Sequence, residues 1–259
     1  MCVLLAYIFL LGPESFHMLA EAQMQYANLS SASWGQGNRD IHYDYDANGS
    51  LTEKITAIKD EPDPQTNYEE KITYIYNLQN RLAQIIREYD DAGDKVEEFT
   101  EYVYNDAGIR VSKHIWSEVN DTHQNDDVTV VYLVDPYNHT GYTQTLEELT
   151  FNYANPDPVT ETPDSLTTYI IGDDVIGQAV DGTVQYLLYD GHGSTRQLAE
   201  YSSGTGDVSV VDSYSYDGHG VLLQDNSVAS LNPGYTPPQA TNLLYAGEHF
   251  DTDAQQYYN

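Results

Sequence analysis

One five-residue pattern recurs along this chain and constrains its fold more than any other feature. It consists of Tyr, then Asp or Asn, two variable residues, and Gly or Asn. The first, second and fifth residues of the copies are Tyr45, Asp46, Gly49; Tyr76, Asn77, Asn80; Tyr89, Asp90, Gly93; Tyr104, Asn105, Gly108; Tyr189, Asp190, Gly193; and Tyr216, Asp217, Gly220. Such regular recurrence indicates a repeated structural unit.

Each position of this pattern has a physical role in a turn. Tyr favours a β-strand, and the short side chain of Asp or Asn can bond the backbone two residues further on. Gly and Asn both tolerate a positive φ, which indicates a left-handed residue at the end of the turn. Each copy therefore predicts a strand end, an Asx-stabilised turn and a returning strand.

The spacing of the copies predicts an array of hairpins. The copies at Tyr45, Tyr76 and Tyr104 are 31 and 28 residues apart, and those at Tyr189 and Tyr216 are 27 apart. A period near thirty is typical of repeats that bury their faces against their neighbours. We therefore predict an all-β fold of repeated antiparallel β-hairpins that form a curled sheet. Helical turns are expected only at 146–149 and in the N-terminal segment.

Composition narrows the classes of function. The chain has 259 residues, a formal net charge of −31, and 24 Tyr residues against 5 Phe and 2 Trp. This charge disfavours nucleic acid and anionic membranes as partners, and it is compatible with high solubility or with a salty habitat. No stretch is long and apolar enough for a transmembrane span. The single cysteine, Cys2, excludes an intramolecular disulfide.

The order of segments suggests four regions. Residues 1–22 contain an apolar run and a small-x-small sequence, which favour a signal peptide; the alternative is a buried or amphipathic leader. Residues 23–40 are expected to be a linker and 41–120 a series of hairpins. Residues 128–259 are expected to continue the same sheet.

The motifs in these regions resemble the YD-repeat proteins, which comprise the bacterial Rhs (rearrangement hot spot) family and the related teneurin shell. Residues 45–52, Tyr-Asp-Ala-Asn-Gly-Ser-Leu-Thr, are similar to the repeat, as are 76–82 and 104–111. Residues 189–196, Tyr-Asp-Gly-His-Gly-Ser-Thr-Arg, are similar to the Rhs repeat-associated core, and 216–220 and 245–251 follow in the order of that core.

The resemblance implies a β-sheet ribbon that spirals into a hollow shell around a C-terminal toxin or, in teneurins, supports cell–cell recognition. No self-cleavage motif or effector follows the core in this sequence, so we expect a partial shell. The leading hypothesis is a non-catalytic shell fragment of a secreted or cell-envelope protein. Its partners would be the rest of a longer shell or a downstream effector. The alternative is a surface recognition module that binds carbohydrate or a partner protein. No cofactor, metal or catalytic residue is predicted.

Two groups of residues suggest chemistry, and a structural interpretation is preferred for both. Asp44, Asp46 and Asn48 match the first half of a calcium loop, but Ile55 stands where a bidentate Glu is needed. His192, His219 and Ser194 suggest a hydrolase. However, His occupies the same repeat position twice and no Gly-x-Ser-x-Gly pattern is present.

The dipeptide 135–136, Asp-Pro, also occurs in the self-cleavage motif of the resembled family. Its surroundings match the beginning of the core instead, so we interpret it as structural. A further expectation follows from a partial shell, because unpaired sheet edges invite association. The net charge opposes that association at low salt.

Overall fold

The computed structural model describes residues 39–58, 62–138, 141, 143–154, 156–202, 204–218, 220, 222–223 and 241–258. The predicted leader at 1–22, most of the predicted linker, Cys2 and His219 lie outside these residues. In the described part, the regular structure is β-strand apart from one short 3₁₀ helix. None of its helices is long and apolar enough to cross a membrane.

The strands follow one another closely along the chain. They are β1 (Arg39–Tyr45), β2 (Leu51–Ile58), β3 (Glu70–Tyr76), β4 (Leu82–Asp91), β5 (Asp94–Tyr104), β6 (Arg110–Val119), β7 (Thr122–His123), β8 (Val128–Asp135), β9 (Gln144–Phe151), β10 (Ser165–Ile171), β11 (Val175–Val180), β12 (Thr183–Tyr189), β13 (Thr195–Ser202), β14 (Asp207–Ser213), β15 (Ser215–Tyr216), β16 (Leu222–Leu223), β17 (His249–Asp251) and β18 (Gln256–Tyr258). The 3₁₀ helix η1 is Tyr245–Gly247.

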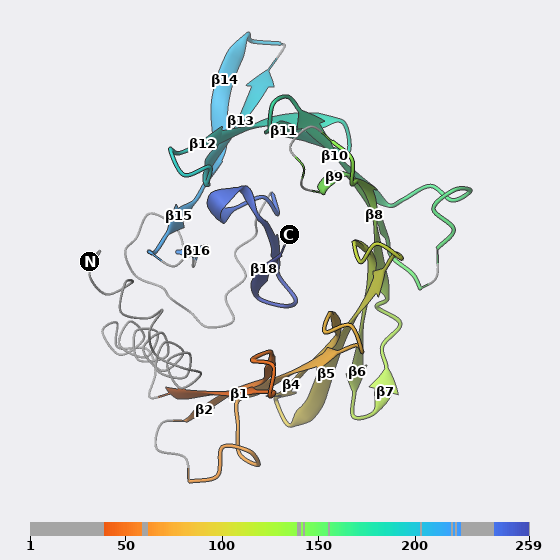
Figure 1. Cartoon of the computed structure of the whole chain (residues 1–259), viewed down its shortest axis with the longest axis vertical. Coiled ribbons are helices and arrows are strands. Elements are labelled where there is room, and N and C mark those ends of the chain that lie inside the picture. The colour runs from red at the N-terminus through yellow and green to blue at the C-terminus, as the bar shows by residue number, and fades with distance from the viewer. Residues whose placement is uncertain are drawn as a thin grey trace.

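One antiparallel sheet of 14 strands dominates the molecule. Strands β1 to β14 lie in the order of the sequence, except that β7 pairs only with β6 and so stands beside the main row. Figure 1 shows that this sheet curls into an open arc and that β18 lies on its concave side. The prediction of an all-β, curled sheet of hairpins is therefore confirmed.

Hydrogen bonds of the Asx side chain define the turns between several of these strands. Asp46 Oδ1 accepts from the backbone N–H groups of Asn48 at 2.8 Å and Ser50 at 2.9 Å. Asn77 Oδ1 makes the equivalent bonds to Gln79 and Arg81 at 2.9 and 3.1 Å. The Asx side chains thus accept hydrogen bonds from backbone N–H groups of the turn, where the chain reverses.

The copy that begins at Tyr89 forms a different turn from the one that its sequence suggests. β4 continues through Asp90 to Asp91, and Asp91 pairs with Asp94. The chain reverses at Ala92 and Gly93, whose φ values are 56° and 99°. Two consecutive positive φ values belong to a tight two-residue hairpin, whose twist matches that of the flanking strands.

The helical turn expected at 146–149 is wrong, because these residues lie in strand β9. Leu149 pairs with Val131 of β8 on one side and with Leu166 of β10 on the other. The two hydrogen-bonded ladders outweigh the helical preference of a Leu-Glu-Glu-Leu sequence.

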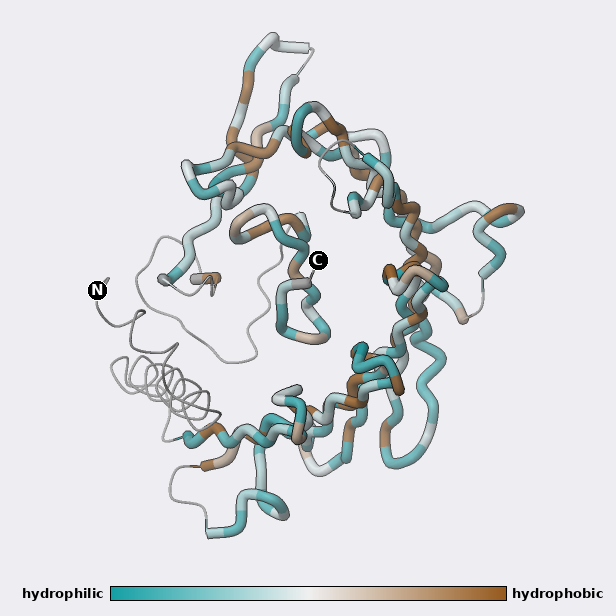
Figure 2. Tube along the Cα trace, viewed as in Figure 1, coloured by the Kyte–Doolittle hydropathy of each residue, from teal (hydrophilic) through white to brown (hydrophobic). Residues whose placement is uncertain are grey.

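The C-terminal segment helps to form the hydrophobic core. Figure 2 shows apolar residues along the whole arc of the sheet. One buried cluster joins Leu187 and Leu198 of the sheet to Leu244. A second joins Ile72 and other inner side chains to Ala254. Residues 241–258 thus cover two parts of the concave face.

Candidate functional site: the concave face and its C-terminal hairpin

In three copies of the motif, at Tyr76, Tyr104 and Tyr216, the tyrosine anchors its turn to an earlier one. The hydroxyl of Tyr76 donates to the carbonyl of Leu51 at 3.0 Å, and that of Tyr104 donates to Leu82 at 2.8 Å. Each acceptor lies two residues after the last residue of an earlier copy, which for Tyr104 is the copy at 76–80. A Phe ring could bury the same area but could not make this bond. The recurrence of Tyr was a signal for this role that sequence reasoning missed, although the Tyr89 hydroxyl donates to Glu98 instead.

Side chains also connect neighbouring turns. Ser50 Oγ donates to Asn80 Oδ1 at 3.2 Å. The guanidinium of Arg81 lies 5.7 Å from the ring centre of Tyr104, and a Cβ added at Gly108 would be 2.2 Å from Arg81 Nη2. From β1 to β6, the motif residues and the residues that directly follow them thus build contacts between hairpins.

The hairpin of β17 and β18 is held on the concave face by a buried carboxylate. Asp251 Oδ2 accepts from the Tyr102 hydroxyl at 2.8 Å and from Arg110 Nη1 at 2.6 Å. Lys113 Nζ lies 3.6 Å from Asp251 Oδ1, and the Asp251 side chain is only 2% exposed. Burial tends to raise the pKa of Asp251, but Lys113, Arg110 and the Tyr102 bond outweigh it and lower this pKa.

The turn of this hairpin makes further polar contacts. Lys113 Nζ donates to Asp253 Oδ2 at 2.5 Å, and Lys54 Nζ donates to Gln255 Oε1 at 2.8 Å. Burial is the main cause that raises the pKa of Asp253, and Lys113 compensates it only in part. Cations of β2 and β6 therefore face polar groups of the hairpin, although the chain as a whole is strongly acidic.

A buried carboxylate binds the start of the C-terminal segment. Glu148 accepts from the Tyr169 hydroxyl at 2.6 Å and from Asn242 Nδ2 at 3.1 Å. His249 Nδ1 lies 3.8 Å from Glu148 Oε1 and packs edge-on against the Tyr169 ring. Burial lowers the pKa of His249, while Glu148 opposes this effect.

One of the residues considered for a hydrolase, Ser194, serves this same attachment together with its neighbour Thr195. Ser194 is buried, and its Oγ accepts from the backbone N–H of Ala246 at 3.0 Å. Thr195 Oγ1 donates to the carbonyl of Leu243 at 2.6 Å. His192 is exposed and is held by its backbone N–H, which donates to Asp190 Oδ1 at 2.8 Å. His219, the third residue considered for a hydrolase, lies outside the described residues.

One candidate calcium ligand, Asp46, has a structural role in the turn. Asp46 Oδ1 already accepts two backbone N–H groups, and Ile55 is buried within β2. Across the described ranges, no group of three or more His, Cys, Asp or Glu side chains could hold a metal ion. The Asp-Pro dipeptide at 135–136 lies where β8 ends and a turn begins. Asp135 Oδ1 accepts a hydrogen bond there from the backbone N–H of Tyr137 at 2.9 Å.

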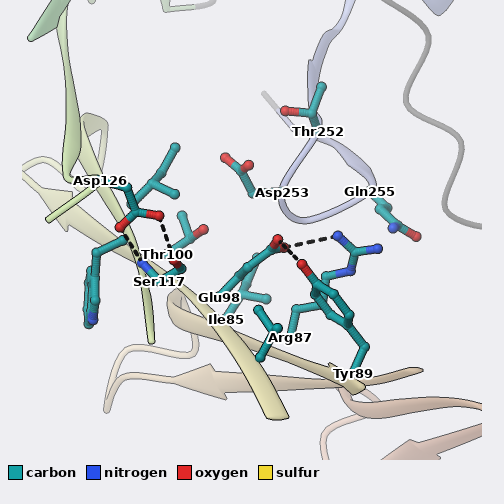
Figure 3. Close-up of a pocket in the computed structure, with 13 residues that line it drawn as sticks. Ile85, Arg87, Tyr89, Glu98, Thr100, Ser117, Asp126, Thr252, Asp253 and Gln255 are labelled. Carbon is teal, nitrogen blue, oxygen red and sulfur yellow. Dashed lines mark hydrogen bonds and ion pairs between the residues drawn. The ribbon is translucent and has the colours of Figure 1, made fainter. Parts of the chain in front are cut away.

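A cleft of about 410 Å³ lies between the docked hairpin and the sheet (Figure 3). In that view, Thr252, Asp253 and Gln255 face the side chains of β4–β6 across the opening. The lining residues are Ile85, Arg87, Tyr89, Val96, Glu98, Thr100, Ile115, Trp116, Ser117, Asp126, Thr252, Asp253 and Gln255. Sequence reasoning did not find this cleft, because its walls come from segments that are more than 120 residues apart.

Comparisons with known proteins do not identify a family for this chain. No family profile matches the chain, and no curated protein matches it in sequence. The chain is similar to a solved structure described as TcdB2-TccC3 without its hypervariable C-terminal region, with a TM-score of 0.42 and 12% sequence identity. The match covers 85% of this chain and 8% of that chain.

Proposed function

We propose that this chain is a non-catalytic structural segment of a β-shell, whose concave face receives the chain's own C-terminal segment. The observation that carries the proposal is the buried network around Asp251, which joins the hairpin to Tyr102, Arg110 and Lys113. Such a network favours one position of the hairpin, because moving Asp251 away would leave the Arg110 charge buried without this partner.

The motif resemblance gives this role a biological setting. In an Rhs or YD-repeat protein, such a segment would belong to a longer secreted or surface shell that encloses or displays a C-terminal effector. The similar TcdB2-TccC3 structure is described as lacking a hypervariable C-terminal region. In our proposal, the docked hairpin would lead a following segment out of the concave face.

Hydrogen exchange of the full chain tests the docking directly. We expect slow exchange at the backbone N–H groups of 249–257 and much faster exchange in Asp251→Lys, which places a cation beside Arg110 and Lys113. The matched control is Asp207→Lys at the start of β14, an exposed residue far from the hairpin contacts. Equal, fast exchange in the parent chain and in both variants would contradict the proposal.

The genomic sequence downstream of the codon for Asn259 tests the setting. An in-frame continuation into a self-cleavage motif and a small variable domain would make this chain part of a toxin carrier. A stop codon at that position would exclude the carrier role and leave the alternative of a free-standing recognition module.

A further inference from the structure

The cleft under the hairpin combines an apolar floor with acidic walls. Its floor consists of apolar side chains of the sheet, such as Ile85 and Ile115, and its walls carry the carboxylates of Glu98, Asp126 and Asp253. In Figure 3, Glu98 and Asp126 lie on the sheet side of the opening and Asp253 lies on the hairpin side. A volume of about 410 Å³ falls in the range of small-ligand sites.

Asp126 brings a negative charge of fixed orientation to this cleft. Its carboxylate accepts from the backbone N–H and the hydroxyl of Ser117 at 2.9 and 2.5 Å. Burial opposes ionisation, but these bonds outweigh it and lower the pKa of Asp126, so the side chain is ionised at neutral pH. Within the described part of the chain, no Lys, Arg or His nitrogen lies within 4.0 Å of this carboxylate. Its charge is therefore free to attract a cationic ligand.

The charges of Glu98 and Asp253 are compensated only in part. Arg87 contacts Glu98 at 3.0 Å, but it also contacts Glu70 at 2.6 Å, so two carboxylates share one cation. Burial raises the pKa of Asp253, and the charge of Glu98 adds to this effect, although Lys113 opposes it. The carboxylates of the two walls therefore repel each other, and a cation placed between them would relieve this repulsion.

We propose that this cleft binds an organic cation, an ammonium or guanidinium group on an aliphatic chain, through Glu98, Asp126 and Asp253. Carboxylates accept the several N–H donors that such a group presents. The apolar floor suits the hydrocarbon chain of the ligand, as apolar surfaces suit the stems of Lys and Arg side chains. A net charge of −31 raises the concentration of cations around the chain.

This chemistry is shared by free amines and by the Lys or Arg side chains of a peptide. The proposal rests on the proposed docking of the hairpin, since Asp253 and Thr252 belong to one wall of the cleft. It goes beyond that docking, because the hairpin could cover the sheet without leaving a site for a ligand.

Calorimetric titration of the full chain tests this site. Agmatine and putrescine are the free amines, and N-acetyl-L-arginine amide represents a peptide side chain. Butanediol is the neutral counterpart of putrescine, and calcium chloride supplies a cation without a hydrocarbon chain. We expect agmatine to bind, and Asp126→Asn and Glu98→Gln should each weaken it about tenfold or more, as expected for a hydrogen bond to a charged group. Thr252→Trp, which fills the cleft from the hairpin, should abolish binding.

A matched control is essential, because a chain with a net charge of −31 attracts cations at many places. Glu101→Gln removes one charge from the same strand as Glu98 on the opposite face of the sheet. It should bind agmatine as the parent chain does. An equal loss of binding in Glu101→Gln and Asp126→Asn would indicate diffuse attraction and overturn the site.

The remaining outcomes separate the sources of the ligand and the two proposals. Binding of the arginine amide as tightly as agmatine supports a peptide side chain, and binding of the free amines alone supports a free amine. Hydrogen exchange at 249–257 is recorded in each variant. A docked hairpin without agmatine binding, butanediol binding as tightly as putrescine, or binding of calcium alone would overturn the cation site. An undocked hairpin in the parent chain would instead overturn the proposed function.

Discussion

A motif tyrosine provides a hydroxyl that a phenylalanine could not replace. Tyr104 donates to the Leu82 carbonyl, so Tyr104→Phe leaves that carbonyl without this partner. We expect a loss of about 1 kcal/mol in the free energy of unfolding. Chemical denaturation measures it, with Tyr137→Phe as the control, because Tyr137 is 94% exposed. An equal effect of the two substitutions would show that the hydroxyl bond does not stabilise the turn.

Replacing Asp251 or Asp253 of the hairpin by Asn should change the free energy of unfolding to different extents. The pKa of Asp251 is lowered in the fold, so its carboxylate stabilises docking above the unfolded pKa of about 3.9 and loses this effect at lower pH. Asp251→Asn should cost about 3 kcal/mol at neutral pH, because Arg110 and Lys113 lose a buried partner.

The pKa of Asp253 is raised, so its ionised form opposes folding at neutral pH. Asp253→Asn should therefore cost far less than Asp251→Asn, or even stabilise the chain. Denaturation curves of both variants at neutral pH provide the comparison. A larger loss in Asp253→Asn would reverse the assigned roles of the two carboxylates.

At the scale of the elements, the turns differ in how closely neighbours pack against their last residue. Gly49 and Gly108 have nearly the same φ, 85° and 86°. A Cβ added at Gly49 would have no atom within 4 Å, whereas a Cβ added at Gly108 would meet the Arg81 side chain. Gly49→Ala should cost about 1 kcal/mol from backbone strain alone. Gly108→Ala should cost more, because Arg81 must also leave the Tyr104 ring.

Asn80, with a φ of 59°, shows that Asn is accepted at this position. Gly49→Asn should therefore be less destabilising than Gly49→Ala, since Asn tolerates the left-handed region. Thermal unfolding of the three variants ranks these effects. Equal losses in Gly49→Ala and Gly49→Asn would contradict the conformational explanation.

The pH dependence of hairpin docking should follow His249. Burial lowers its pKa, with Glu148 opposing and Arg110 assisting this shift. As pH falls below about 6.5, the undocked state takes up a proton that the docked state excludes, so docking weakens. Hydrogen exchange at 241–258 between about pH 7.5 and about pH 5 measures this loss. His249→Gln should flatten the profile, and an unchanged profile would assign the effect to other groups.

The repeated motif predicted the strands and turns because its signal is local. Period-two alternation and a left-handed residue are properties of a few neighbouring residues. The docking of the hairpin was not predicted, since Asp251 meets Tyr102 and Arg110 across more than 140 residues of sequence. Leu149 illustrates the same limit, because the partners that make its segment a strand lie in β8 and β10.

At the scale of the whole molecule, an open sheet exposes its last strand. Among the described strands, β14 pairs only with β13, and Val208 and Val210 are 68% and 52% exposed. An exposed apolar edge can pair with the same edge of a second copy. A net charge of −31 opposes such contact at long range.

Salt should therefore promote self-association of this chain. The screening length falls from about 10 Å at 0.1 M salt to about 3 Å at 1 M, which removes most of the repulsion between copies. Sedimentation velocity should show monomers at low salt and larger species at high salt. Val210→Lys, which places a charge on the edge, should suppress them, while Val103→Lys on the interior strand β5 should do so less. Association that is independent of salt, or equal in both variants, would exclude β14 as the contact.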